Sequence, residues 1–404
     1  MLQLFHMGIV PERVKWYNQF IHRHGCLTSG RLPDDRLYPV LREHNKESNM
    51  TDNLKKKCEL LIQNRAAISD KFKFEKDVMS IVAALIFTGA DKEADIEKLE
   101  ECRKILSKHT SAFSEYRDAI KLALISEMAL SGEPEQYIDD VKDVYRKLHK
   151  GKIKDNSYMV LAAMLICDLG RQDDADVIIE KYNEIMKHNE KQHPFLTDSE
   201  DIPYVILLAL SGRSVDSVIS DIDESFDYLK NICKIGSGSD SIQGLSEILA
   251  LTDGDIREKC ESVITIINAL KAGKADIGGY ALPALGILIN SGESAETIAN
   301  DIIEADKYLR NCKGFDEKAA EIGQRMMFAA SLAAVSYEAA SPAISNICIG
   351  SAFSIIKPKQ VATMITVTGN ILPALLEVFL SSGSSDKTDS SQSEQSDTVQ
   401  APKE

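Results

Sequence analysis

The sequence predicts an all-α protein made of tandem helix-pair repeats, about six units with a period of 38 to 43 residues, forming an α-solenoid or an α/α toroid-like array. Two observations predict this class. A short apolar stretch that closes on a glycine recurs six times, and internal repeats of this length are typical of helical arrays. No segment alternates apolar and polar residues for long, as a half-buried strand would.

Six glycines mark the repeat, namely Gly89, Gly132, Gly170, Gly212, Gly254 and Gly292. The residues before each glycine are almost wholly apolar, as in the run from Met159 to Ile166, so a helix formed there must be covered by neighbours. Glycine suits the end of such a helix because it readily adopts the left-handed conformation that closes a C-terminus. Each unit is therefore expected to contain one inner, buried helix.

A second, one-sided segment follows each glycine after a polar turn. In the last unit Ile298, Ile302, Ala305 and Leu309 share one face at helical spacing, and the other face is charged. This pattern predicts an outer, half-solvated helix. Since neither helix buries its apolar surface alone, we expect the units to stack.

The composition divides the chain into four parts. We expect an N-terminal extension (1–49), a helical repeat domain (50–340), apolar capping helices (341–380) and a disordered Ser-rich tail (381–404). Two interpretations of residues 1–49 stay open. Either Met50 is the real start, with Thr51 or Asp52 capping a helix, or residues 1–49 are a genuine arm that packs on the first unit.

Two apolar stretches, 343–356 and 361–380, follow the repeats. The second is long enough to span a bilayer, but it carries Asn370 and Glu377, which are costly in a membrane without partners. A membrane hairpin is therefore the less favoured interpretation. A helical hairpin that seals the last unit or forms an oligomer is favoured.

The charge and the cysteines exclude several classes of function. A net charge of -15 disfavours nucleic-acid binding, since phosphate backbones are repelled. None of the eight cysteines forms a C-x-x-C pair, so neither a zinc site nor a redox pair is predicted. No phosphate loop or dinucleotide fingerprint occurs, and no cofactor is expected. Residues 2–10 do not resemble a secretory signal, which makes a cytoplasmic location the expectation.

The most site-like stretch is the polar insertion 188–203. His188 and His193 are candidate metal ligands, and His193, Asp198, Glu200 and Asp201 are candidate catalytic residues, because imidazoles and carboxylates serve both roles. The favoured alternative is structural. In it, His193-Pro194 ends one helix and the acidic residues cap the next.

Three segments resemble a bacterial family, domain of unknown function 4003. They are 76–85, 193–197 and 280–286, and the likeness spans roughly residues 51–340. The resemblance implies a bacterial, cytoplasmic, helical protein and implies no activity. It also favours Met50 as the start, because residues 1–49 have no counterpart in the pattern.

Two functions fit the sequence. A scaffold or interaction module that binds a protein or peptide is favoured, because helix-pair arrays present extended surfaces and no catalytic motif is present. The alternative is a hydrolase-like helical-toroid enzyme that uses the loop carboxylates and His193. A closed ring with carboxylates directed into a central pocket would favour the enzyme.

Overall fold

The structure is a computed structural model that describes residues 50–337, apart from 74, 76, 113, 118–119, 150–156, 198, 200, 276, 278, 280–281 and 316–321. Across these residues every regular element is a helix and no strand occurs, so the all-α prediction is confirmed. The predicted extension, the apolar segment 341–380 and the Ser-rich tail lie outside the described residues.

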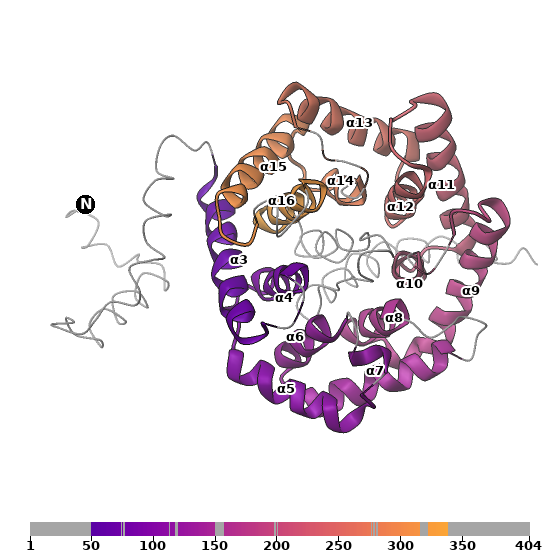
Figure 1. Ribbon diagram of the computed structural model, residues 1–404. Helices are drawn as coiled ribbons and strands as arrows, with labels where there is room; N and C mark the ends of the chain where they lie inside the picture. The colour runs from indigo at the N-terminus through magenta and orange to yellow at the C-terminus, as the bar shows by residue number, and fades with distance from the viewer. Residues whose placement is uncertain are drawn as a thin grey trace, which may run out of the picture. The chain divides into compact units, whose positions relative to one another are not determined.

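The described α-helices lie in two layers, one inside the other (Figure 1). The outer layer contains α3 (Asp52–Lys71), α5 (Ile96–His109), α7 (Pro134–His149), α9 (Ala175–Gln192), α11 (Val215–Asp227), α13 (Ile256–Ala272) and α15 (Ala295–Arg310). The inner layer contains α4 (Asp77–Gly89), α6 (Lys121–Ser131), α8 (Ser157–Asp168), α10 (Ile202–Leu210), α12 (Ser239–Leu249), α14 (Leu282–Leu288) and α16 (Ile322–Ser336). Short 3-10 turns, η2 (Glu115–Arg117) and η3 (Gln172–Asp174), and a π-helical turn, η4 (Tyr228–Ile232), connect or extend these helices.

The two layers differ in burial as their apolar content predicts. All nine residues of α10 are buried, from Ile202 to Leu210. In α15 the buried face includes Ile298, Ile302 and Leu309, whereas charged residues such as Lys307 are exposed. The inner layer is therefore the hydrophobic core, and the outer layer separates it from water.

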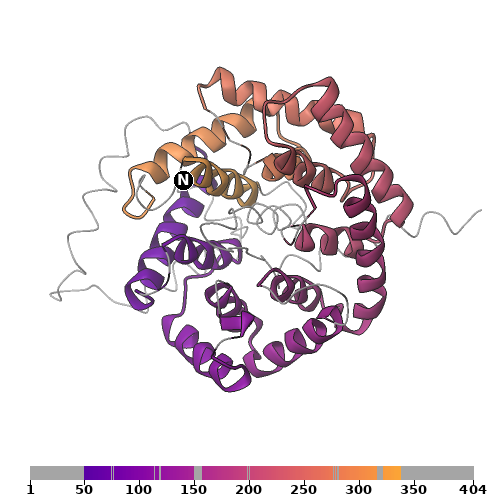
Figure 2. The same ribbon diagram turned by 45° about the vertical axis from the view of Figure 1, so that its right-hand side comes forward.

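The first described helix packs against the last two, so the helices of residues 50–337 return to their starting point (Figure 2). In α3, Arg65 donates a hydrogen bond to the carbonyl oxygen of Lys313 at 3.2 Å, and its guanidinium lies 5.7 Å from the ring centroid of Phe315. The Asn53 side chain, also in α3, donates to the backbone oxygen of Ser336 at the end of α16. These contacts join segments more than 240 residues apart and close the ring.

The helix ends follow the glycine pattern with one exception. Gly132, Gly170, Gly212, Gly254 and Gly292 all have positive φ angles. Gly89 is instead the last residue of α4, and Asp91 adopts the left-handed conformation two residues later, with φ 53°. At the start of α3, Thr51 accepts a hydrogen bond from the backbone N–H of Leu54 at 3.3 Å, which confirms the predicted cap.

One exposed helix end offers a test of this backbone geometry. Lys274 follows α13 with φ 60°, a conformation that costs a side-chain-bearing residue about 1 kcal/mol. The Lys274→Gly variant is expected to raise the melting temperature by about 2 °C, measured by circular dichroism. Lys271→Gly, three residues earlier within α13, should lower it instead. A lower melting temperature for Lys274→Gly would contradict the expectation.

Among the described helices, none combines the length and the apolar composition needed to cross a membrane. The segment 361–380, for which the sequence leaves a membrane interpretation open, lies outside the described residues.

Candidate functional site

The loop between α9 and α10 contains the residues that the sequence singles out. Helix α9 ends at Gln192, and the backbone N–H of the C-cap residue His193 donates to the carbonyl oxygen of Asn189 at 2.7 Å. Pro194 has no N–H with which to continue the helix. The expectation that His193-Pro194 ends a helix is therefore confirmed.

Both candidate metal ligands of this loop contact α11. The His188 Nε2 atom lies 3.0 Å from Asp223 Oδ2, and the His193 ring centroid lies 4.3 Å from that of Phe226. Burial lowers the pKa of His193, although the negative charge of Asp223 opposes this shift. In the described part of the chain, no three His, Cys, Asp or Glu residues are grouped so that they could hold a metal ion. Metal binding by the two histidines stays a prediction.

Of the three acidic candidates, only Asp201 lies within the described residues. Asp198 and Glu200 lie outside the described residues. Asp201 is buried and occupies the N-cap position of α10, but its side chain makes no capping hydrogen bond there. Its negative charge, after burial and Glu190, contributes to raising the pKa of Tyr182, a phenol on α9 that is 1% exposed. The charge of Asp201 thus acts on a buried side chain of α9, beside the loop.

A buried polar cluster lies beneath the loop and was missed at the level of sequence. It consists of Asn189 on α9 and of Gln243 and Glu247 on α12, none of which is more than 1% exposed. Asn189 Nδ2 donates to Glu247 Oε1 at 2.9 Å, and Gln243 Nε2 lies 3.5 Å from the Thr197 hydroxyl of the loop. A carboxylate within the mostly apolar segment 242–251 is the signal that could reveal it, since buried charges require partners.

This cluster is suited to holding the loop in place. Glu247 is 0% exposed, and Asn189 on the outer helix α9 supplies a hydrogen-bond donor to its carboxylate. The hydrogen bond ties α9 to α12 across the layers, while Gln243 contacts the loop itself. These side-chain hydrogen bonds connect α9, α12 and the loop.

The loop presents an aromatic side chain to solvent. Phe195 is 97% exposed, whereas its neighbour Leu196 packs against the core. The backbone N–H groups of Leu196 and Thr197 both donate to the His193 carbonyl oxygen, at 2.9 and 3.1 Å. The tip is therefore a hydrogen-bonded turn with one side chain partly buried and one projecting.

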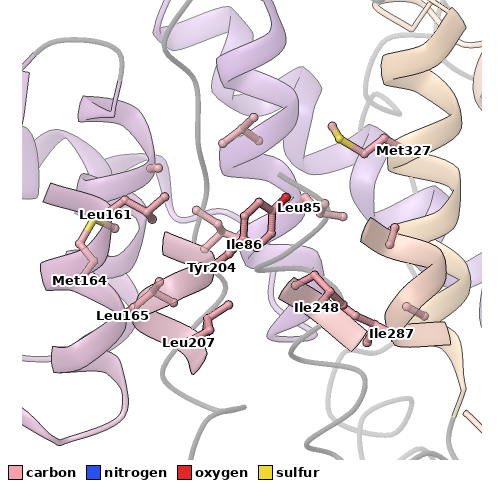
Figure 3. Packing of buried hydrophobic residues seen from close by; sticks show 14 of the residues in the cluster. Leu85, Ile86, Leu161, Met164, Leu165, Tyr204, Leu207, Ile248, Ile287 and Met327 are labelled. Atoms are coloured by element: carbon pink, nitrogen blue, oxygen red, sulfur yellow. The ribbon is translucent and has the colours of Figure 1, made fainter. Parts of the chain in front are cut away.

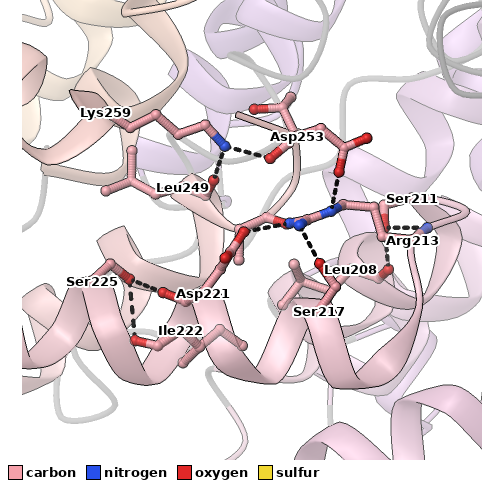
Figure 4. Close-up of polar contacts among 12 residues, drawn as sticks. Leu208, Ser211, Arg213, Ser217, Asp221, Ile222, Ser225, Leu249, Asp253 and Lys259 are labelled. Atoms are coloured by element: carbon pink, nitrogen blue, oxygen red, sulfur yellow. Dashed lines mark hydrogen bonds and ion pairs between the residues drawn. The ribbon is translucent and has the colours of Figure 1, made fainter. Parts of the chain in front are cut away.

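A second polar cluster, the Arg213 clasp, joins the next two units (Figure 4). The Arg213 side chain is 7% exposed, and it forms ion pairs at 2.8 Å with Asp221 and Asp253. It also donates to the Ala250 carbonyl oxygen at 2.6 Å. Nearby, Lys259 donates to the Leu249 carbonyl oxygen at 2.9 Å, and burial together with the charge of Arg213 lowers the pKa of Lys259. The clasp satisfies carbonyls at the end of α12 that the helix itself leaves unpaired.

Comparison with known proteins identifies one family. The family described as Protein of unknown function (DUF4003) matches residues 64–361. No curated protein and no solved structure matches the chain. Because the matched residues make up more than half of the sequence, the chain belongs to the DUF4003 family of proteins of unknown function.

Proposed function

We propose that this protein is an interaction module that binds a protein or peptide partner through the loop 193–197. The observation that carries the proposal is Phe195, whose ring is 97% exposed on a loop that the interior holds in place. Aromatic anchors supply much of the binding energy in protein interfaces, and a preorganised loop loses little conformational entropy on binding.

Several contacts support preorganisation of the loop. Its first residue, His193, packs on Phe226, and its last, Thr197, contacts the buried Gln243 side chain. Among the described residues only Val177, Phe195 and Ile232 are large hydrophobic residues with exposed side chains, and Phe195 is the most exposed of them. The ordered turn and its projecting ring favour recognition by a partner that offers an apolar pocket.

The architecture supports the same function. We infer that the helix pairs are tandem repeats closed into an α/α toroid-like array. Its glycine-marked units, about six, are preceded by α3 and followed by α16, which gives seven outer and seven inner helices in the described residues. Arrays of this kind commonly serve as binding scaffolds. The chain's charge of -15 favours a basic partner. A bacterial, cytoplasmic setting is part of the proposal, and the free thiols of the six described cysteines fit a reducing compartment.

The enzyme alternative has two structural requirements: a closed ring, and carboxylates directed into a central pocket. The contacts between α3 and the last helices support the first requirement. The second has less support. Glu247 accepts its hydrogen bond from the outer helix α9, and the loop histidines contact α11. Hydrolysis of a panel of glycoside and peptide substrates that is abolished by His193→Ala and retained in Phe195→Ala would favour the enzyme.

A photo-cross-linking experiment tests the interaction function. Benzoylphenylalanine placed at position 195 should capture a reproducible protein partner in cells of the source organism, identified by mass spectrometry. The same group at position 177 is the matched control, because Val177 is also exposed, at 59%, but lies on the outer helix α9. Equal capture at both positions, or none at 195, would contradict the proposal.

The Phe195→Ala variant gives the quantitative prediction. Loss of an aromatic anchor should weaken binding of the captured partner about 30-fold, equivalent to about 2 kcal/mol, as measured by isothermal titration calorimetry. Because the ring is exposed, the free energy of unfolding should change by less than about 0.5 kcal/mol. Val177→Ala should leave the affinity unchanged. An unchanged affinity for Phe195→Ala would remove the anchor role.

A further inference from the structure

The inner helices are buried on every side, including the side that faces the centre of the ring. In α10 nine consecutive residues are buried, and in α8 ten consecutive residues from Ser157 to Ile166 are buried. Successive residues of an α-helix point about 100° apart, so nine or ten of them sample all directions around the axis. Something therefore covers the central side of each helix.

The described helices account for the other sides. Helix α10 packs against α9 in the outer layer and against its inner neighbours α8 and α12. Helix α14 packs in the same way against α13, α12 and α16. These contacts cover the outer side and both flanks, and the side left over faces the centre of the ring (Figures 1 and 2).

Apolar side chains from six of the seven described inner helices are buried in the inner region. Figure 3 shows buried hydrophobic side chains from six inner helices turned toward a common region. They are Leu85, Ile86, Leu161, Met164, Leu165, Tyr204, Leu207, Ile248, Ile287 and Met327. None of them is more than 8% exposed, so whatever covers them must itself be largely apolar.

We propose that residues 343–380 of the same chain occupy the centre of the ring and cover this face. The segment is mostly apolar, and its charged residues are only Lys357, Lys359 and Glu377. It follows α16, which belongs to the inner layer and ends at Ser336, so it is attached to the ring by only a few residues. The family match runs to residue 361, past α16 and through the stretch 343–356, which makes that stretch part of the family domain.

The chain's own segment fits better than a second copy. Covalent attachment to α16 gives it a high effective concentration at the centre. A second copy would bring another charge of -15 and an outer layer rich in charged residues toward an apolar face. The inference concerns the core and is independent of the proposed binding through Phe195.

Site-specific cross-linking in the full chain tests the proposal. Azidophenylalanine is placed at Tyr204, whose ring Figure 3 shows among the inner-face side chains, and the illuminated protein is digested and sequenced by mass spectrometry. Intrachain cross-links from position 204 should fall within residues 343–380. The matched control is Tyr145 on the outer helix α7, whose ring centroid lies 5.1 Å from that of Tyr116 and which should cross-link near there.

Circular dichroism of both azido variants verifies that they retain the fold before cross-links are compared. Cross-links from position 204 only to residues 50–337, to a second copy, or to co-purified lipid would each overturn the proposal. Equal labelling of 343–380 from positions 204 and 145 would overturn it as well, because a segment placed at the centre is reached from the inner layer alone.

Discussion

Replacing Arg213 with methionine is expected to lower the free energy of unfolding by about 3–5 kcal/mol, measured by urea denaturation. Methionine keeps much of the aliphatic volume but removes the charge. Asp221, 17% exposed, would lose its partner at 2.8 Å, and the Ala250 carbonyl oxygen would lose a donor at 2.6 Å. An unpaired buried carboxylate and an unpaired buried carbonyl each carry a large desolvation penalty.

The control for this prediction is Arg257, an exposed arginine on α13 that pairs with a carboxylate on α11. Arg257 lies 2.7 Å from Glu224, but its side chain is 64% exposed, so solvent screens the pair. Arg257→Met should therefore cost less than about 1 kcal/mol. Arg213→Lys should recover only part of the loss, because one ammonium cannot reproduce the several directions in which the guanidinium donates. Similar losses for Arg213→Met and Arg257→Met would show that the clasp contributes no more than a surface pair.

Much of the fold could be predicted from local patterns. Local signals that span only a few residues predict buried helices with left-handed ends. Examples are the apolar run 159–166 and the glycines after the inner helices. The sequence does not decide whether the ring closes, because closure depends on contacts such as Arg65 with Lys313, which join residues 248 positions apart. Nothing near either residue indicates that pairing.

In the polar sites, too, the local features can be predicted from the sequence and the long-range contacts cannot. The end of α9 at His193-Pro194 follows from proline chemistry and was predicted. The partners of the loop were not, because Gln243 and Glu247 come from a helix that begins well after it. Arg213 follows a glycine and resembles a solvated turn residue, yet its partner Asp253 lies 40 positions later in another loop. Polar groups on different units meet only when the layers pack.

The second large effect is expected at the buried ion pair that joins α15 to α16. Arg325 Nε lies 2.6 Å from Asp306 Oδ1, and the two side chains are 1% and 5% exposed. Asp306→Ala should lower the free energy of unfolding by about 3–5 kcal/mol, because the guanidinium stays buried without its carboxylate. Glu304→Ala is the control, since Glu304 pairs at 2.8 Å with Lys307, which is 60% exposed, and should cost less than about 1 kcal/mol.

A double variant separates the cost of an unpaired charge from the loss of the pair itself. Asp306→Leu combined with Arg325→Met removes both charges and retains apolar volume, so it should be more stable than Asp306→Ala. Equal or lower stability of the double variant would mean that Arg325 contributes mainly through other contacts, such as its 3.5 Å approach to the Phe315 carbonyl oxygen. The Phe315 ring also lies under Arg65 of α3, so the damage should reach the closure of the ring. Hydrogen exchange of α3 amides distinguishes the outcomes: faster exchange in Asp306→Ala means that the ring opens as one cooperative unit, and unchanged exchange confines the opening to α15 and α16.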